Sequence, residues 1–502
     1  MTKAIKRLLI ANRGEIASRI IKTAREMGIH TIAVYSEADI HAPFVRLADE
    51  SHLIGPAASI ESYLRKDKII DVAKKSCADA IHPGYGFLAE NAEFAEMVDA
   101  NNIIFIGPAP EAMRLMGDKT SARRLARSLQ VPMVEGIVDT VESVEEISKA
   151  AEKIGYPVLI KASAGGGGKG MRIVKSPAEL ESSYRMARSE AKSAFNDDRV
   201  YIEKYLENPR HIEVQILADM HGNVVHLGER ECSIQRRHQK IIEESPSVAV
   251  DELLRAKITD SAIKLAQAGK YVNAGTLEFL VDKDKNFYFL EMNTRLQVEH
   301  PVTEMRTGLD LVKEQIRIAE GKKLPFRQDE IHFRGAAVEC RLYAEDSFNS
   351  FFPSTGVITY LSANHGIQTR EDSGIEAGSE LNTYYDPMLS KLITWGNNRG
   401  EALERMSRFL KDYKIYGVRT NLDICSWIVD YPEFRSGNFL MSFIPQHFSL
   451  DVLAKPSEIE IQIASIAAFL HDRKLASQTS IKTTVSGQSV SRWKNKRFSD
   501  EP

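Results

Sequence analysis

The chain has 502 residues, of which 43% are hydrophobic and 27% charged, and its formal net charge of −3 predicts a globular protein of roughly two to four domains without a nucleic-acid partner. The cysteines Cys77, Cys232, Cys340 and Cys425 lie too far apart for a zinc ribbon and make a disulfide framework improbable. No apolar run reaches the roughly 18 residues of a membrane span, so we expect a cytoplasmic protein without a membrane segment.

The first hundred residues alternate strand-like and helix-like segments. "RLLIA" (7–11) and "HTIAVY" (30–35) read as strands, and the amphipathic stretch 14–28 between them reads as a helix. The same alternation continues to residue 108, which predicts a parallel sheet covered on both faces, an α/β domain over residues 1–115. Its first turn, "ANRGEIA", lacks the G-x-G-x-x-G dinucleotide fingerprint.

The pattern changes after residue 115. Helical and antiparallel-looking segments predict an α+β domain over residues 116–334, and a third domain of strands and helices over 335–445. The remaining segment, 446–502, contains one amphipathic stretch at 457–472 and then a polar tail that we expect to be partly disordered. The fold class predicted is a multidomain protein combining α/β and α+β parts.

A hairpin at 274–293 brings two acidic residues together. Its apolar halves flank the polar turn "DKDK", and folding about the midpoint of Asp284 and Lys285 sets Glu278 opposite Glu291. Directly opposed like charges destabilise a sheet. A buried pair of carboxylates therefore shares a proton or holds a cation.

The polar residues continue with period two beyond the hairpin. Alternation from residue 291 to 299 places on one face of an extended chain Glu291, Asn293, Arg295, Gln297 and Glu299. An ordinary half-exposed strand would also show this pattern. The residue types favour a site instead, because oxygen ligands suit Mg²⁺ and arginine suits a planar anion. We therefore expect nucleotide phosphates to meet a small acid here.

The stretch "KASAGGGGKGMR" (161–172) places four glycines between lysines and between two strand-like segments. A flexible linker is the simplest interpretation. Glycines also let backbone N–H groups turn toward phosphate oxygens, and the lysines add charge, so the alternative is a phosphate-binding lid. The run lacks G-x-x-x-x-G-K-[ST] and is not a Walker A loop.

A basic cluster occupies residues 235–240. A charged surface strand is the better interpretation for Arg236 and Arg237, whereas His238 and Lys240 alternate and can point together into a cleft. His82 ends a strand of the first domain, where ligands often bind, but taken alone it reads as a structural turn residue.

Several segments together resemble one enzyme family, biotin carboxylase of the ATP-grasp superfamily. They are "LIANRGEIA", "HPGYGFLAEN", "KASAGGGGKGMR", "ENPRHIEVQI", "ERECSIQRRHQK", "EMNTRLQVEHPVTEM" and "ECRLYAED", in family order from about residue 4 to 445. The resemblance implies a Rossmann-like amino-terminal domain, an ATP-grasp domain with a mobile lid at about 133–205, and a carboxy-terminal domain.

The resemblance also implies site residues. For the nucleotide it implies Lys119, Lys161, Gly167, Gly168, Glu203, Lys204, Leu206, His211, Gln235 and His238. For two Mg²⁺ or Mn²⁺ ions it implies Glu278, Glu291 and Asn293. For bicarbonate it implies Lys240, Arg295, Gln297 and the N–H of Val298, with Glu299 as general base, and it places Arg341 at the ureido oxygen of biotin.

The family's reaction follows from the weakness of bicarbonate as an electrophile. ATP phosphorylates bicarbonate to carboxyphosphate, which releases CO₂ for biotin, while a closed lid excludes water. The chain has no Met-Lys pair that could carry biotin, so we expect a separate biotin carboxyl carrier protein and a carboxyltransferase subunit as partners, and a homodimer by resemblance. The tail is a candidate docking segment.

The final acceptor stays open among acetyl-CoA, as in fatty acid biosynthesis, propionyl-CoA, methylcrotonyl-CoA and pyruvate. Leu342 and Tyr343 stand where many stand-alone bacterial members have Ile and Asn, which favours the acyl-CoA or pyruvate carboxylase types. Two other functions compete: an ATP-grasp ligase such as half of a carbamoyl phosphate synthetase, and a catalytically silent scaffold. A scaffold has no need of opposed buried carboxylates.

Overall fold

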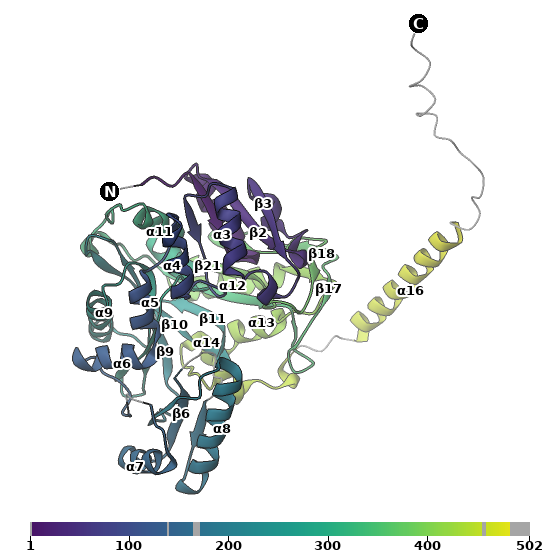
Figure 1. Ribbon diagram of the computed structural model, residues 1–502. Coiled ribbons are helices and arrows are strands. Elements are labelled where there is room, and N and C mark those ends of the chain that lie inside the picture. The colour runs from purple at the N-terminus through teal and green to yellow at the C-terminus, as the bar shows by residue number, and fades with distance from the viewer. Residues whose placement is uncertain (1–2, 138–139, 164–170, 454–457, 482–502) are drawn as a thin grey trace. The chain divides into compact units, whose positions relative to one another are not determined.

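The amino-terminal part is an α/β layer, as the alternation of segments predicts (Figure 1). The computed structural model describes residues 3–137, 140–163, 171–453 and 458–481. The first sheet has the strand order β3-β2-β1-β4-β5, with all neighbours parallel. Its strands are β1 (Arg7–Ile10), β2 (His30–Ser36), β3 (Glu50–Gly55), β4 (Ala80–His82) and β5 (Ile104–Phe105). Its helices are α1 (Gly14–Glu26), α2 (Pro43–Leu47), α3 (Lys66–Lys75), α4 (Ala92–Ala100) and α5 (Pro110–Gly117).

Successive residues of β1 pack into different cores. Leu8 and Ile10 belong to one apolar cluster and Leu9 to another. Side chains of a strand alternate between the faces of its sheet, so both faces are buried, as is usual for parallel sheets.

A second, antiparallel sheet forms the centre of the molecule, in the order β13-β12-β9-β10-β11-β14-β21-β19. Its strands are β9 (Arg210–Ala218), β10 (Val224–Arg236), β11 (Gln239–Ser245), β12 (Asn273–Val281), β13 (Phe287–Asn293), β14 (Ala336–Tyr343), β19 (Thr369–Ser373) and β21 (Met388–Gly396). The pairing of β11 with β14 makes this sheet continuous across the boundary predicted at residue 334.

Helices and short strands surround the central sheet. The helices are α6 (Lys119–Ser128), α9 (Glu252–Ala268), α10 (His300–Thr307), α11 (Leu311–Ala319), α12 (Arg399–Asp412), α13 (Leu422–Asp430), α14 (Pro432–Ser436) and α15 (Phe443–His447). The short strands are β15 (Glu345–Asp346), β16 (Phe352–Pro353), β17 (Gly356–Val357), β18 (Tyr360–Ser362), β20 (Glu380–Leu381) and β22 (Lys414–Tyr416).

The two faces of the central sheet differ in chemistry. On β9 the odd positions His211, Glu213 and Gln215 are buried and polar, whereas Ile212 and Val214 join an apolar core with α9. Burial of the apolar face stabilises the sheet, which leaves the polar face free to form a site.

The segment predicted as a lid has its own small sheet and core. Strands β6 (Val158–Ala162), β7 (Arg172–Val174) and β8 (Val200–Lys204) pair in the order β7-β6-β8, with helices α7 (Val144–Ile154) and α8 (Pro177–Phe195) (Figure 1). Val158, Ile160 and Ile202 are buried in this core. The glycine run and its predicted phosphate contacts at Gly167 and Gly168 lie outside the described residues.

The described residues divide into two units, one ending at Leu450 and the other beginning at Asp451. The second contains α16 (Glu458–Ile481), a longer helix than the amphipathic stretch predicted there. Several of its apolar side chains are more than half exposed: Ile459, Ile461, Ile463, Ile466, Phe469 and Leu470. The tail predicted to be disordered, 482–502, lies outside the described residues.

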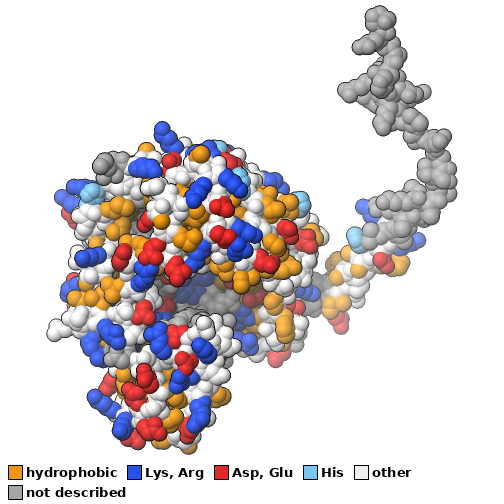
Figure 2. Space-filling model, in the orientation of Figure 1, with side chains coloured by type: hydrophobic (Ala, Val, Ile, Leu, Met, Phe, Trp, Pro, Cys, Tyr) orange, Lys and Arg blue, Asp and Glu red, His pale blue; other side chains and the backbone are white. Residues whose placement is uncertain are grey.

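The surface agrees with the balanced composition. Acidic and basic side chains are interspersed over the face seen in Figure 2. None of the helices in the described ranges is both long and apolar enough to cross a bilayer.

A buried ion pair in the body makes stability depend on pH. The Glu244 carboxylate on β11 accepts a hydrogen bond from Arg399 Nε at 2.7 Å. Burial raises the pKa of Glu244 to about 7, although Arg399 lowers it. The pKa of Glu244 is higher in the folded than in the unfolded protein. Its contribution to the free energy of unfolding is therefore complete below about pH 4.5 and is lost as pH rises through about 7.

We expect Glu244→Gln to reduce that pH dependence. Between about pH 6 and pH 8.5, the free energy of unfolding should fall by about 1 kcal/mol more in the wild type than in the variant. Urea titrations at both pH values measure the difference. Parallel declines in the two proteins would contradict the raised pKa.

Candidate active site

A cavity of about 1140 Å³ lies against the polar face of the central sheet. Every site residue predicted from the sequence that falls within the described part of the chain lines it. These are Lys119, Lys161, Glu203, Lys204, Leu206, His211, Gln235, His238, Lys240, Glu278, Glu291, Asn293, Arg295, Gln297, Val298, Glu299 and Arg341. The residues come from α6, the lid segment, the central sheet with its connections and the segment after β13, so one cavity brings together separate parts of the sequence.

A row of charged residues crosses the sheet beneath this cavity. Glu291 of β13 pairs with Glu278 of β12, Glu278 pairs with Glu213 of β9, and Glu213 pairs with Arg230 of β10. The opposition of Glu278 and Glu291 is confirmed. The register differs nearer the turn, where Phe279 pairs with Phe289 and leaves Leu290 as an extra residue in a β-bulge.

The acidic row is balanced by cations. Glu291 lies 2.9 Å from Lys119 Nζ, and Glu278 lies 3.1 Å from His211 Nε2 and 3.2 Å from Lys240 Nζ. Burial acts to raise the pKa of Glu278, but Lys240 and His211 outweigh it, so the pKa lies well below its ordinary range. Glu278 is therefore a carboxylate at neutral pH.

The oxygen ligands predicted for a metal fit a divalent cation in type and placement. Glu278 and Glu291 are opposite on one face, and Asn293 follows Glu291 on the same side of β13. Asn293 Nδ2 donates to Glu278 Oε1 at 2.8 Å, so its amide already reaches the acidic pair. Carboxylates beside an amide oxygen suit a hard cation such as Mg²⁺.

Lys240 joins the row to the predicted bicarbonate residues. Its Nζ donates to Glu213 Oε2 and to Glu299 Oε1, both at 2.6 Å. Burial lowers the pKa of Lys240, but Glu213, Glu278 and Glu299 raise it well above its ordinary value. Lys240 is thus held as a cation.

Glu299 lies between two cations. Lys240 donates to one carboxylate oxygen, and Arg341 Nη2 donates to the other at 2.8 Å. Burial raises the pKa of Glu299, but Lys240 and Arg341 lower it well below 4.5. The side chain is therefore unprotonated at neutral pH, which is the state that a general base requires.

Both arginines predicted for the substrates are held by carboxylates. Arg341 Nε donates to Glu243 Oε1 at 2.5 Å, from the neighbouring strand β11. Arg295 Nε donates to Glu90 Oε2 at 2.9 Å, and Glu90 follows β4 in the amino-terminal part. A guanidinium fixed from one side presents its remaining N–H groups in a defined direction.

The prediction that His238 and Lys240 alternate along one strand is wrong, because His238 lies in a turn and Lys240 in β11. Arg237 and His238 form a two-residue hairpin turn between β10 and β11, with φ of 50° and 68°. Turns of this kind need positive φ at both central residues. His238 and Lys240 nevertheless both line the cavity, because the turn lies at its edge.

The alternation after residue 291 is correct only in part. Strand β13 ends at Asn293, so the residues from 294 to 299 do not continue it. The polar side chains still line the cavity, while Leu296 is buried in an apolar core.

Two residues considered in the sequence analysis, Arg236 and His82, have structural surroundings. Arg236 pairs with Glu345 at 2.5 Å and stacks on Phe351, and only 14% of its side chain is exposed, so the surface interpretation is wrong for this residue. His82 is fully buried and its Nδ1 accepts from the backbone N–H of Gly84, as a turn residue does.

Lid residues of the cavity are also paired. Lys161 Nζ lies 2.5 Å from Glu203 Oε1, and Arg123 Nη1 lies 2.9 Å from its Oε2. Lys204 Nζ donates to the backbone carbonyls of Gly155 and Tyr156. Glu203 thus holds a lysine at the cavity while Arg123, which the sequence did not suggest, balances its second oxygen.

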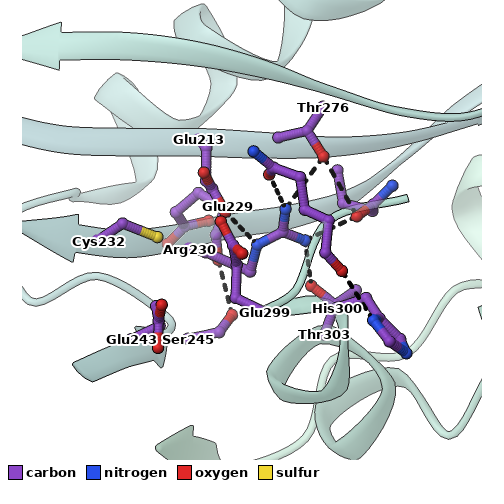
Figure 3. A network of polar contacts seen from close by, with 12 residues as sticks. Glu213, Glu229, Arg230, Cys232, Glu243, Ser245, Thr276, Glu299, His300 and Thr303 are labelled. Atoms are coloured by element: carbon purple, nitrogen blue, oxygen red, sulfur yellow. Dashed lines mark hydrogen bonds and ion pairs between the residues drawn. The ribbon is translucent and has the colours of Figure 1, made fainter. Parts of the chain in front are cut away.

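Sequence reasoning missed the residue at the centre of the polar network, Arg230. It is fully buried and donates to Glu213 at 2.5 Å, Gln297 at 2.8 Å and Thr276 at 3.0 Å (Figure 3). Gln215 and Thr303 accept further bonds from it. Two of its partners, Glu213 and Gln215, lie on β9. Their alternation with His211 could have indicated this polar face, since it has the same period of two as residues 291–299.

Family models match three consecutive parts of the chain. They are "Biotin carboxylase, N-terminal domain" over residues 4–113, "Carbamoyl-phosphate synthase L chain, ATP binding domain" over 118–327, and "Biotin carboxylase C-terminal domain" over 339–446.

Curated proteins of two kinds are similar. Biotin carboxylase 1 of Bacillus subtilis is 50% identical over 441 residues, which cover 88% of this chain and 98% of that protein. The mitochondrial methylcrotonoyl-CoA carboxylase subunit alpha of Mus musculus is 49% identical over 484 residues, 96% of this chain and 67% of that one. The mitochondrial propionyl-CoA carboxylase alpha chain of Homo sapiens is 48% identical over 93% of this chain, which spans 65% of the relative.

Solved structures agree in fold. A biotin carboxylase–β-γ-ATP complex from Campylobacter jejuni has a TM-score of 0.87 at 48% identity, covering 88% of this chain and 99% of that one. The biotin carboxylase domain dimer of Hydrogenobacter thermophilus 2-oxoglutarate carboxylase, with MgADP, ADP and bicarbonate, has a TM-score of 0.87 at 44% identity, covering 91% and 100%.

Proposed function

The chain belongs to the biotin carboxylase family, and on this premise we propose how its residues share the ATP- and bicarbonate-dependent carboxylation of biotin. It is an ATP-dependent ligase. One observation carries the assignment of roles: the acidic row of Glu278 and Glu291 shares a single cavity with Lys240, Arg295 and Arg341. Carboxylates for a metal and cations for small anions are the requirements of phosphoryl transfer to bicarbonate.

We assign the nucleotide to the lid side of the cavity. Lys119 and Lys161 contact its phosphates, which replace the carboxylates that now pair with these lysines. The adenosine contacts Glu203, Lys204, Leu206, His211, Gln235 and His238, and Gly167 and Gly168 belong to the lid. Glu278, Glu291 and Asn293 hold Mg²⁺ or Mn²⁺, which neutralises negative charge on the phosphates when bound.

Bicarbonate binds beside the acidic row, on Lys240, Arg295, Gln297 and the N–H of Val298. Arg230 does not line the cavity and is not assigned a contact with the substrate. It donates to Gln297 Oε1 and so turns the amide N–H₂ of Gln297 toward the cavity, where that group now donates to Glu278 at 2.9 Å. The bound anion shares Lys240 with Glu299. That sharing weakens the attraction that depresses the pKa of Glu299 and makes the carboxylate a stronger base.

Glu299 removes the bicarbonate proton, and the resulting oxyanion attacks the γ-phosphorus of ATP with ADP as the leaving group. Carboxyphosphate then separates into CO₂ and phosphate. Arg341 supplies fixed positive charge to the ureido oxygen of biotin as N1 gives its proton to the released phosphate and attacks CO₂. The buried contact with Glu243 holds Arg341 in that direction.

We keep the domain bounds predicted from the sequence as proposals: 1–115, 116–334 with a lid at about 133–205, 335–445, and an extension over 446–502. Homodimerisation and a cytoplasmic location are proposals of the same kind, and two of the relatives are named as mitochondrial.

We also propose that the chain works with a biotin carboxyl carrier protein and a carboxyltransferase on an acyl-CoA or on pyruvate. The carboxylase alpha chains support this, although this chain spans only about two thirds of their length. The exposed isoleucines of α16 are a suitable docking surface, because apolar patches on a helix gain stability when a partner covers them.

Deleting residues 451–502 is expected to abolish coelution of the chain with its carboxyltransferase while leaving free-biotin carboxylation within about twofold. Gel filtration with the partner and an ATPase assay measure the two properties. Full assembly of the shortened chain would overturn the docking role.

The experiment that tests the function measures ADP release with ATP and Mg²⁺ and varies bicarbonate and free biotin independently. We expect release to require bicarbonate and to rise with biotin. Bicarbonate-dependent release that biotin does not change would favour a carbamoyl phosphate synthetase-like ligase. Calorimetry showing nucleotide binding independent of Mg²⁺, without turnover, would favour the scaffold.

A further inference from the structure

Two neighbouring strands hold two consecutive residues of the proposed bicarbonate site. Arg341 of β14 and Lys391 of β21 are direct cross-strand partners. Arg341 Nη2 donates to the Glu299 carboxylate at 2.8 Å, and Lys391 Nζ donates to the backbone carbonyl of Val298 at 3.0 Å. One cation thus fixes a side chain and the other fixes the main chain immediately before it.

Lys391 is fully buried, and its charge is balanced by acids from other elements. Its Nζ lies 3.2 Å from Glu15 Oε2 on α1 and 3.7 Å from Asp372 Oδ2 on β19. Arg370 in turn pairs with Asp372 at 2.7 Å. The amine is therefore fixed in position from two sides before it reaches Val298.

This arrangement is costly for stability alone. Like charges directly opposite on neighbouring strands repel, and a buried ammonium loses its hydration. Apolar residues of similar volume at such a place are often as stable as an ion pair. Of the hydrogen bonds and ion pairs that Lys391 makes with the described residues, the bond to the Val298 carbonyl is the one that reaches a residue of the cavity.

We propose that Lys391 is a positioning residue for bicarbonate, which rests on the function proposed above. By holding the Val298 carbonyl it limits rotation about that residue. Because that carbonyl lies in the peptide plane that leads to Glu299, holding it limits ψ of Val298 and fixes the place of Glu299 relative to the Val298 N–H, and both groups are assigned to the anion. Lys391 itself does not line the cavity.

The test compares Lys391→Met with Arg399→Met, which removes another cation of the body, one paired to Glu244 away from the bicarbonate residues. We expect Lys391→Met to raise the KM for bicarbonate about tenfold, the size of one lost hydrogen bond, with the KM for ATP within about twofold. The Arg399→Met variant should leave both KM values near those of the wild type.

A double variant separates positioning from folding. Glu15→Gln together with Lys391→Met removes both members of the pair, which is expected to recover stability lost in Lys391→Met. The raised KM for bicarbonate should persist in the double variant. If stability and KM recover together, Lys391 is only structural and the inference is overturned. The double variant also provides the test if the single variant does not fold.

The outcomes distinguish failure of the role proposed for Lys391 from failure of the function proposed for the whole chain. A wild-type enzyme without bicarbonate-dependent ADP release would refute the proposed function. A wild type with that activity, and a Lys391→Met variant whose KM for bicarbonate is unchanged or rises in step with that for ATP, would refute the role of Lys391 alone.

Discussion

Replacing Glu299 by glutamine is expected to lower biotin-dependent ATP cleavage by about a hundredfold or more, while the affinity for MgATP changes little. Glutamine has the shape of glutamate, and its carbonyl can accept from Lys240 or Arg341, which now donate to the two carboxylate oxygens. The amide cannot take up the bicarbonate proton. Steady-state assays and nucleotide calorimetry measure the two effects.

The matched control is Glu339→Gln. Glu339 is buried on β14, and neither of its carboxylate oxygens has a hydrogen-bond partner among the described residues. Burial, together with Glu243, raises the pKa of Glu339 well above its ordinary value despite Lys391, which favours the neutral form that glutamine resembles in shape. This variant should keep wild-type activity. Undiminished turnover of Glu299→Gln would exclude the role of Glu299 as base.

Replacing Arg341 by glutamine is expected to separate the two stages of the reaction. Transfer of CO₂ to biotin should fall by about a hundredfold, because the charge facing the ureido oxygen is lost. Bicarbonate-dependent ATP cleavage should fall by about tenfold or less, since Lys240 still contacts Glu299. Label transfer to biotin and ADP release, measured on the same samples, give the ratio.

Equal losses in the two assays would contradict this assignment, because they would mean that Arg341 acts only through Glu299. Arg341→Lys is the companion variant. It keeps the charge but loses the second N–H group that binds Glu243, so biotin transfer should recover in part.

Local patterns were sufficient to predict the acidic hairpin. Two apolar strands around a polar turn have few possible registers, and the one with opposed glutamates is found. The bulge at Leu290 was not predictable from the local pattern; next to it, Phe279 pairs with Phe289 and their rings pack edge to face. It shifts the register near the turn and leaves the pairing of Glu278 and Glu291 as predicted.

The hydrogen-bond partners of the site residues could not be predicted from the sequence. Glu213, Arg230 and Glu243 meet the predicted residues only because of the strand order, in which β9 lies between β12 and β10 and β11 pairs with β14. Periodicity within a segment gives the face of each residue but not the neighbour of its strand. The family resemblance implies ligands and roles, whereas the buried partners are defined only by the three-dimensional fold.

The most direct test of the account is transfer of labelled carbon from bicarbonate to free biotin by the purified chain. With MgATP we expect acid-labile carboxybiotin to form together with ADP, and chelation of the metal to abolish both. Tight binding of MgATP without label in biotin, at bicarbonate and biotin concentrations that saturate a homologous enzyme, would contradict the reaction assigned to this cavity.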